Sequence, residues 1–466
     1  MNPLWTSTEC EAATLGHSFR AFEAGGLSID TRTLKPGDLF VALKGDARDG
    51  HEFVQAALDA KAAAALVSRA PQGVAANAPL LMVANTLRGL EDLGRASRAR
   101  SNAKIVGITG SAGKTTTKEM LRLAFGALGR THASSASYNN HWGVPLSLAS
   151  MPRDAQFGIF EIGMNHFAEV RNLASFVRPH VAMVTTIAPA HLEFFGNCEA
   201  IADAKSEIFE GLVPGGAAII PSDSPFAGRL MARARQAAVG RVFTFGEVAG
   251  SDARLLSSTP ADVGMKVEFE ILGKRGAFRI GAPGGHIARN ALAALLAVAA
   301  LEGDVLNAAA ALEKFVALKG RGARFTIKVD EGDAEVIDES YNANPASMSA
   351  AFALLGSAVV GKGGRRIAAV GDMLEMGPDA RAHHAAIARD IEAAHVDLVY
   401  ANGPNMMALW DALPSSRRGG YGKTSAEIAP QIAGALKAGD VVLVKGSLGS
   451  KMAVVIDALK ARGVAG

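Results

Sequence analysis

The chain of 466 residues has little cysteine and no long apolar run. Its two cysteines, Cys10 and Cys198, lie far apart and form no C-x-x-C pair, which argues against a disulfide framework and a zinc knuckle. No stretch of about 18 apolar residues occurs, and the N-terminus lacks a basic segment followed by an apolar one. We therefore expect a cytoplasmic protein with no membrane insertion.

An excess of either charge is also missing, since the chain has 48 lysines and arginines against 45 aspartates and glutamates. No long block of like charge occurs, whereas proteins that bind nucleic acid or membrane surfaces concentrate positive charge. Small molecules are therefore favoured as partners over nucleic acid. At roughly 150 residues per domain, the length predicts about three domains.

A glycine-rich loop, T-G-S-A-G-K-T-T at residues 109–116, separates an apolar strand at 104–109 from a helix over residues 118–125. In such a loop glycines let N–H groups and the helix N-terminus face phosphate, while the lysine and threonine reach the β/γ-phosphates and Mg²⁺. The strict pattern needs glycine at position 108, where Ile108 stands. The alternative is an ordinary turn with a solvated lysine. We predict a nucleoside triphosphate site at Gly110, Ser111, Ala112, Gly113, Lys114, Thr115 and Thr116.

The pattern of strands and turns divides the chain into three α/β domains. Residues 1–103 form a small α/β module, residues 104–319 a central parallel-sheet ATPase domain with the phosphate loop, and residues 320–466 a Rossmann-like open sheet. Strands that alternate with helices are typical of parallel sheets covered on both faces. A helix at 290–296 is expected to end the central domain. Strands are also expected at 38–43, 64–67, 157–162, 181–186, 217–220, 335–338, 366–370, 397–400 and 441–444.

Two polar residues follow strands of the central domain. Glu161 stands at the carboxyl end of one strand, and His191 follows the next. Such ends meet at one edge of a parallel sheet, here beside the phosphate loop, so Glu161 is a candidate Mg²⁺ ligand. A carboxylate that caps the next turn and a structural histidine are the alternatives. Lys205, in a helical segment, is by itself typical of a solvated lysine.

These features together resemble the Mur ligases, ATP-dependent amide-forming enzymes that assemble the peptide of bacterial cell-wall precursors. The resemblance covers almost the whole chain. It is carried by the variant phosphate loop and by short motifs at residues 30–32, 36–43, 49–51, 139–140, 143–146, 161–166, 188–191, 204–205, 286–290, 320–324, 338–345, 371–375 and 444–447. The most specific pair is Y-N-A-N-P-x-S-M at 341–348 with G-D-M-L-E at 371–375.

That pair indicates the branch of the family that joins D-Ala-D-Ala to a UDP-N-acetylmuramoyl-tripeptide. The resemblance implies that the acceptor carboxylate attacks ATP to give an acyl phosphate, which the amine of the dipeptide then attacks. ATP and Mg²⁺ are the implied cofactors, and a monomer is expected. The third domain is expected to close over the central one around a hinge at residues 320–324, which would exclude water.

The resemblance also assigns catalytic roles in the central domain. Lys114 and Thr115 would hold the ATP phosphates and one Mg²⁺. Glu161, His191 and Lys205 would form a second metal site. In that site Lys205 is carbamylated by CO₂ and becomes an anionic oxygen ligand.

Contacts to the nucleotide and the substrates are implied in the same way. Asn290 matches an adenine contact, Arg324 a contact to ATP phosphates, and Asp338 a ribose or hinge contact. The uridine end of the acceptor is expected at Asp30, Thr31, Arg32, Asp49, Gly50 and His51. Its phosphates or peptide are expected at Asn139 and Asn140. The dipeptide is expected at Tyr341, Asn342, Asn344, Lys445 and Ser447.

The dipeptide residues have a simpler alternative, since Asn and Ser in glycine-rich loops often only form turns. One departure from the family pattern also bears on them. Many relatives have arginine where this chain has Leu448. Any contact that this arginine would make to a substrate carboxylate must therefore come from another residue, and Lys451 is a candidate.

Other functions stay open on the sequence alone. A sibling ligase would add an amino acid such as diaminopimelate or lysine, and a folylpolyglutamate-type ligase is a further relative. The motif at 49–51 disfavours the folate branch, and the loop around Tyr341 disfavours the sibling. A nucleotide-binding regulatory ATPase would leave the polar strand ends of the third domain unused.

Overall fold

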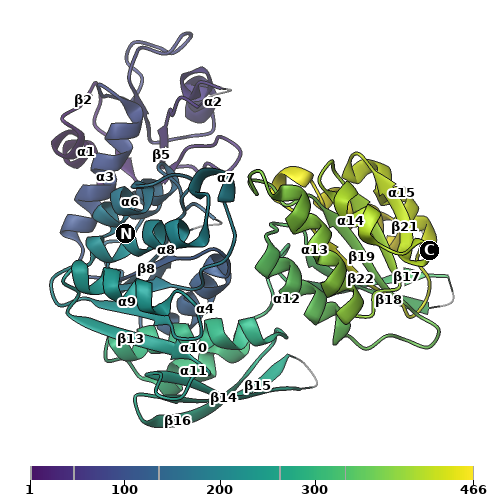
Figure 1. Cartoon of the computed structure of the whole chain (residues 1–466). Coiled ribbons are helices and arrows are strands. Elements are labelled where there is room, and N and C mark those ends of the chain that lie inside the picture. The colour runs from purple at the N-terminus through teal and green to yellow at the C-terminus, as the bar shows by residue number, and fades with distance from the viewer. Residues whose placement is uncertain (1–2, 46–47, 135–136, 262–263, 331, 465–466) are drawn as a thin grey trace.

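A computed structural model describes residues 3–45, 48–134, 137–261, 264–330 and 332–464. Within these residues the strands form three large sheets and one two-stranded sheet. Each large sheet comes from one continuous stretch of chain, and the third stands beside the other two, as the green to yellow part of Figure 1 shows. No helix in the described part of the chain is both long enough and apolar enough to cross a membrane.

The N-terminal sheet is small and mostly parallel. Its strands lie in the order β2 (His17–Ser18), β7 (Leu80–Met82), β6 (Ala64–Val67), β5 (Asp38–Val41) and β4 (Gly26–Ser28). Around it lie β1 (Trp5–Thr6), β3 (Glu23–Ala24), α1 (Ser7–Thr14), α2 (Val54–Asp59) and α3 (Thr86–Arg100). The core of this module extends into the central region, because Leu146 and Ala149 of α5 (Gly143–Ala149) pack in it. Nε1 of Trp5 donates to the carbonyl oxygen of Ala149 over 2.9 Å, which ties the two parts together.

The central sheet combines a parallel and an antiparallel part. Its order is β9 (Thr131–Ala133), β10 (Phe157–Glu161), β8 (Lys104–Thr109), β11 (Val181–Val184), β12 (Ala217–Pro221), β13 (Arg241–Gly246), β14 (Ala253–Pro260), β15 (Met265–Ile271) and β16 (Lys274–Ile280). The pairings from β9 to β14 are parallel, and those of β15 are antiparallel. Buried residues alternate with exposed or partly exposed ones along β15, as expected for an antiparallel strand with one face toward solvent.

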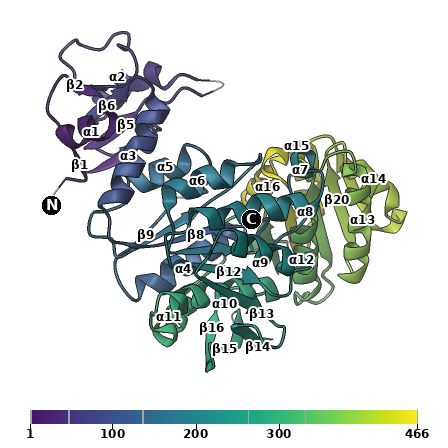
Figure 2. The ribbon, with the colours of Figure 1, turned by 60° about the vertical axis from the view of Figure 1, so that its left-hand side comes forward.

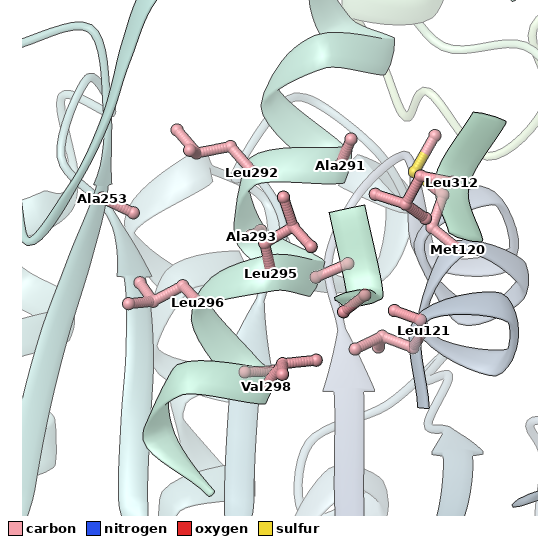
Figure 3. Packing of buried hydrophobic residues seen from close by; sticks show 14 of the residues in the cluster. Met120, Leu121, Ala253, Ala291, Leu292, Ala293, Leu295, Leu296, Val298 and Leu312 are labelled. Atoms are coloured by element: carbon pink, nitrogen blue, oxygen red, sulfur yellow. The ribbon is translucent and has the colours of Figure 1, made fainter. Parts of the chain in front are cut away.

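Helices cover both faces of this sheet. They are α4 (Lys114–Gly126), α6 (Glu169–Val177), α7 (Leu192–Phe195), α8 (Cys198–Ser206), α9 (Ala227–Gln236), α10 (Gly285–Ala300) and α11 (Val305–Ala311). The alanine- and leucine-rich α10 is apolar nearly all round, so it must be buried. Figure 3 shows its side chains between Ala253 of β14 on one side and Met120 and Leu121 of α4 on the other.

The third sheet has helices on both faces and separate apolar cores on each side. Its order is β17 (Ala323–Val329), β18 (Gly332–Glu339), β22 (Val441–Lys445), β19 (Arg366–Gly371), β20 (Leu398–Asn402) and β21 (Arg418–Gly422). Among the described strands of this sheet, the pairing of β17 with β18 is antiparallel and the others are parallel. The helices are α12 (Pro345–Gly356), α13 (Ala380–Ala393), α14 (Met406–Ala412), α15 (Ser425–Ala435) and α16 (Ala453–Val464).

The predicted α/β class with three sheets is confirmed. Two details differ. The antiparallel strands β15, β16 and β17 were not expected, and the helix at 290–296 does not end the central region, because α11 follows it. Figure 2 shows the third domain packed along one side of the central one. The carboxyl ends of β8, β10 and β11 are neighbours at the edge of the central sheet where the functional residues gather.

Candidate nucleotide and metal site

The phosphate loop joins β8 to α4 through two glycines in left-handed or related backbone conformations. Gly110 has a φ of 151°, and a Cβ there would lie 1.9 Å from Oγ1 of Thr185. Gly113 has a φ of 82° and directly precedes α4. Nζ of Lys114 donates to the carbonyl oxygen of Gly110 over 2.8 Å, so the lysine folds back over the loop. The lysine and the N-terminus of α4 place positive charge where a phosphate would bind.

Glu161 lies at the end of β10, beside this loop, and is buried. Oγ1 of Thr115 donates to its Oε2 over 2.9 Å, and Nδ2 of Asn139 donates to its Oε1 over 2.7 Å. Asn140 instead holds the turn before α5, because its Oδ1 accepts from the N–H of Gly143 over 2.9 Å. Carboxylate and hydroxyl oxygens are the ligands that Mg²⁺ prefers, so Thr115 and Glu161 fit a magnesium ion beside the phosphates.

His191 precedes α7 and is held by a residue of the third domain. Its Nδ1 forms a hydrogen bond with Oε2 of Glu375. That hydrogen bond lowers the pKa of the Glu375 carboxyl below its ordinary value, although partial burial acts in the opposite direction. The pair therefore joins an imidazole to an ionised carboxylate across the domain boundary.

Lys205 lies in α8 with only 1% of its surface exposed. Burial lowers the pKa of its amine well below the ordinary value, and the nearby positive charge of Lys114 lowers it further. Among the described residues no hydrogen bond or ion pair reaches its Nζ. The structure thus contradicts a solvated helix lysine and places a buried, unpaired amine in the site.

One cavity of about 530 Å³ lies between the central and third domains. Its wall includes fifteen predicted site residues: Ser111, Ala112, Gly113, Lys114, Thr115, Thr116, Asn139, Glu161, His191, Lys205, Asn290, Tyr341, Asn342, Asn344 and Lys445. The predicted residues outside its wall are Gly110, Asn140, Arg324, Asp338, Ser447 and the six of the N-terminal module.

The third domain contributes a buried lysine and a direct contact to the phosphate loop. Nζ of Lys445 donates to Oε2 of Glu339 and to the carbonyl oxygen of Asn342, both over 3.1 Å. Asn344 caps α12, and its Nδ2 donates to the carbonyl oxygen of Ser111 over 3.3 Å. The two domains therefore already meet at the nucleotide end of the cavity.

Ser447, Leu448 and Lys451 lie outside the cavity wall. Oγ of Ser447 accepts from the N–H of Leu374 over 2.9 Å, which fixes the loop after β19. Leu448 is 64% exposed, and Lys451 is also exposed and does not reach the cavity wall. Lys445, at the end of β22, does reach it.

The junction between the domains is a turn held by Asp338. Gly320 and Gly322 have φ values of 73° and 94°. Oδ2 of Asp338 accepts from the N–H of Gly320 over 3.0 Å, and Oδ1 accepts from the hydroxyl of Ser340 over 2.6 Å. Both carboxylate oxygens are therefore engaged in holding the turn.

The two arginines of this junction point to different surroundings. Arg321 lines the cavity, where its Nη2 lies 3.5 Å from Oγ of Ser137 and its guanidinium 4.2 Å from the ring centroid of Tyr341. Arg324 lies in β17 and donates to Oε1 of Glu335 over 2.8 Å, outside the cavity wall. Arg321 is therefore the arginine nearer the phosphate loop in this arrangement.

The N-terminal residues form two local clusters away from the cavity. Asp49 accepts from both the N–H and Nδ1 of His51, over 3.0 and 2.7 Å. Gly50 approaches the backbone closely, because a Cβ there would lie 2.6 Å from the carbonyl oxygen of Leu43.

The second cluster contains Asp30, Thr31 and Arg32. The guanidinium of Arg32 pairs with Asp30, with Nε donating to Oδ1 over 2.9 Å, and its side chain is 85% exposed. This pairing lowers the pKa of Asp30 to about 2, chiefly through the hydrogen bonds from Arg32. Because the side chain of Arg32 is exposed, its guanidinium is accessible to an anionic ligand while it stays paired with Asp30.

Four residues of the site were given no role from the sequence, although the motifs that carry the resemblance contain them. Arg321, Glu339 and His286 line the cavity, and Glu375 holds His191. Burial lowers the pKa of His286, which favours the neutral form of its ring. Two sequence features could have pointed to them: the glycines on either side of Arg321, and the G-D-M-L-E motif that contains Glu375.

Comparison with known proteins assigns each part of the chain to one family. The Mur ligase family, catalytic domain matches residues 23–98, the Mur ligase middle domain residues 108–298, and the Mur ligase, glutamate ligase domain residues 323–448. A UDP-N-acetylmuramoyl-tripeptide–D-alanyl-D-alanine ligase from Rickettsia prowazekii is 30% identical over 97% of this chain and 99% of its own length. The chain belongs to the Mur ligase family.

Solved Mur ligases share its whole architecture. A MurF structure from Acinetobacter baumannii has a TM-score of 0.84 and 29% identity, covering 98% of this chain and 99% of its own. A MurF ligase from Thermotoga maritima in complex with ADP has a TM-score of 0.77 and 25% identity, covering 94% and 98%.

Proposed function

We propose that this Mur ligase joins D-Ala-D-Ala to a UDP-N-acetylmuramoyl-tripeptide at the expense of ATP, in peptidoglycan precursor synthesis. Relatives that match 81–97% of the chain carry that activity in their names. The observation that carries the proposal is the shared cavity, where Lys114 and Thr115 of the central domain and Tyr341 and Lys445 of the third domain line one space. An amide-forming enzyme needs its nucleotide and its amine within one closed space.

The reaction has two steps. The terminal carboxylate of the acceptor attacks the γ-phosphorus, which forms an acyl phosphate and releases ADP. The amine of the dipeptide then attacks the acyl carbon, and the amide forms as phosphate and a proton leave. Lys114 would neutralise charge on the phosphates in the first step, where two anions must approach each other.

Thr115 and Glu161 would hold one Mg²⁺, and Glu161, His191 and Lys205 a second. Bound there, Mg²⁺ would screen the phosphoryl oxygens from the attacking carboxylate. Lys205 would take part as its carbamate. Because burial lowers the pKa of its amine and so favours the neutral form, the nitrogen can attack CO₂ and lose a proton, which gives an anionic oxygen ligand.

The nucleotide would lie along the phosphate loop, with its adenine at Asn290. We propose that Arg321 contacts the phosphates in this arrangement, and that Arg324 could do so only after the third domain moves. Asp338 would act at the hinge rather than on the ribose, because both of its oxygens are engaged.

The acceptor would extend from the N-terminal module to the cavity. Its uridine end would bind near the clusters at 30–32 and 49–51, and Asn139 and Asn140 would lie along its path. The dipeptide would bind at Tyr341, Asn342, Asn344, Lys445 and Ser447. One chain supplies the whole site, so we expect a cytoplasmic monomer to be active.

The test is phosphate release from ATP with each nucleotide-peptide acceptor paired with each candidate amine. We expect release only with a UDP-N-acetylmuramoyl-tripeptide and D-Ala-D-Ala together. Release with a dipeptide acceptor and a single amino acid would indicate a sibling ligase. Equal release without any acceptor or amine would indicate a regulatory ATPase.

A further inference from the structure

The third domain touches the central domain at the residue proposed to bind metal. Glu375, in the loop after β19, forms the hydrogen bond with Nδ1 of His191. Its carbonyl oxygen also accepts from the N–H of Glu193 over 3.1 Å. Both the side chain and the backbone of Glu375 therefore fix the segment that carries His191.

Both partners of this contact have unusual backbones. His191 has a φ of 57° and Glu375 a φ of 61°, a left-handed conformation that is unfavourable for residues with a Cβ. Such conformations persist where the surroundings determine them, and they gather at functional sites. Two of them face each other here across a domain boundary.

Apolar and close backbone contacts hold the same segments together. Leu192 packs against the apolar core of the central domain and also against that of the third domain. Gly377 has a φ of 69°, and a Cβ there would lie 3.4 Å from the backbone of Glu193. The contact between the loops at 191–193 and 375–377 is thus built from several independent interactions.

The hydrogen bonding of the His191 ring relates this contact to metal binding. Nδ1 is engaged by Glu375, whereas no hydrogen bond to Nε2 is recorded among the described residues. The histidine lines the same cavity as Glu161 and Lys205. Histidines that bind metal usually donate their other ring N–H to a carboxylate, which fixes the tautomer and the ring orientation.

We propose that Glu375 is the positioning residue for His191, so that the third domain supplies the carboxylate that orients a metal ligand of the central domain. This inference rests on the proposed metal role of His191. If Glu375 orients His191, metal affinity depends on the contact between the domains. Glu375 reaches His191 only while the third domain is packed against the central one as in this structure.

The test measures metal affinity directly. Mn²⁺, as a stand-in for Mg²⁺, is titrated by electron paramagnetic resonance into the full-length protein with a non-hydrolysable ATP analogue. We expect Glu375→Ala to weaken Mn²⁺ binding by roughly 10- to 100-fold, the range for outer-shell partners of metal ligands. Glu375→Gln should restore most of the affinity, because its amide oxygen still accepts from Nδ1–H.

Two further variants complete the experiment. Glu392→Ala removes an exposed carboxylate of the same domain and should bind Mn²⁺ as the unchanged protein does. His191→Ala should weaken binding as much as Glu375→Ala, and combining the two should cause no further loss.

The outcomes separate this inference from the proposed function. Unchanged affinity in His191→Ala would remove the metal role of His191. A loss in His191→Ala with unchanged affinity in Glu375→Ala would overturn the positioning role alone. Equal losses in Glu375→Ala and Glu375→Gln would also overturn it, since charge rather than the hydrogen bond would then be responsible.

Discussion

The hydroxyl of Thr115 donates a hydrogen bond to Oε2 of Glu161 over 2.9 Å. The two residues are 46 positions apart in the chain, and they meet because β8 and β10 are parallel neighbours with Glu161 paired to Ile108. Thr115 lies in the first turn of α4, just beyond the end of β8. The strand order of the central sheet thus brings a carboxylate to the phosphate loop, as the proposed magnesium-dependent phosphoryl transfer would need.

Replacing Lys114 by alanine should abolish ligation while leaving the fold intact. The side chain reaches back over the phosphate loop and would neutralise charge that develops on the phosphates. We expect turnover to fall by at least about 100-fold, the scale for one oriented electrostatic donor. Steady-state phosphate release and circular dichroism would measure both effects. The matched control is Lys104→Ala, which removes an exposed lysine from the start of β8, the strand that leads into the phosphate loop. Near-normal turnover in folded Lys114→Ala protein would refute the ATP site.

Much of the central site could be predicted from local sequence. A strand, a glycine loop and a helix form one continuous unit, and Glu161 ends an adjacent apolar strand, so sheet topology alone brings them together. The role of Glu375 could not be predicted in the same way. Its partner His191 is 184 residues away, and their meeting depends on how two domains pack.

The junction shows a second limit of sequence reasoning. Arg321 and Arg324 share one short motif, and composition does not distinguish them. The turn held by Asp338 directs Arg321 into the cavity, whereas Arg324 lies in β17 beside Glu335. The antiparallel strands β15 and β16 were missed, although only Leu272 and Gly273 separate them, and a two-residue turn joins antiparallel strands. The assignments of individual site residues stay predictions.

Arg321→Ala should impair the enzyme more than Arg324→Ala. A guanidinium in the cavity can form a charged hydrogen bond to a phosphate, so its loss should lower kcat/KM for ATP by roughly 10- to 100-fold. Arg324 is paired with Glu335 in this arrangement, and we expect its variant to stay within about twofold, as is usual for surface pairs. Kinetics at varied ATP would measure both. An equal or greater loss in Arg324→Ala would mean that the turn reorganises when the nucleotide binds.

Carbamylation of Lys205 should be detectable in the unchanged protein. With ¹³C-bicarbonate, we expect a carbamate resonance that is absent from Lys205→Ala. That variant should lose at least about 100-fold in turnover, because a ligand for the charged transition state is removed. A small carboxylate such as acetate should restore part of the activity. Full activity of Lys205→Ala without any additive would refute the role.

The pH dependence of stability should report on His180. Burial, with the positive charges of Arg98, Lys104 and Arg178, lowers its pKa to about 4. Its Nδ1 accepts from the N–H of Ile105 over 2.9 Å, which requires a neutral ring. The unfolded chain takes up a proton near pH 6.5, whereas the folded protein does not until about pH 4. The contribution of His180 to the free energy of unfolding is therefore present above pH 6.5 and is lost as the pH falls toward 4.

His180→Asn supplies the comparison, because the amide oxygen can accept the same N–H without titrating. Between pH 7 and pH 5 the unchanged protein should lose about 1–2 kcal/mol more unfolding free energy than the variant. Urea unfolding of both proteins at the two pH values would measure this difference. Carboxylates and the other histidines are common to both proteins, so their contributions cancel. Parallel pH profiles would show that His180 titrates alike in the folded and unfolded chain.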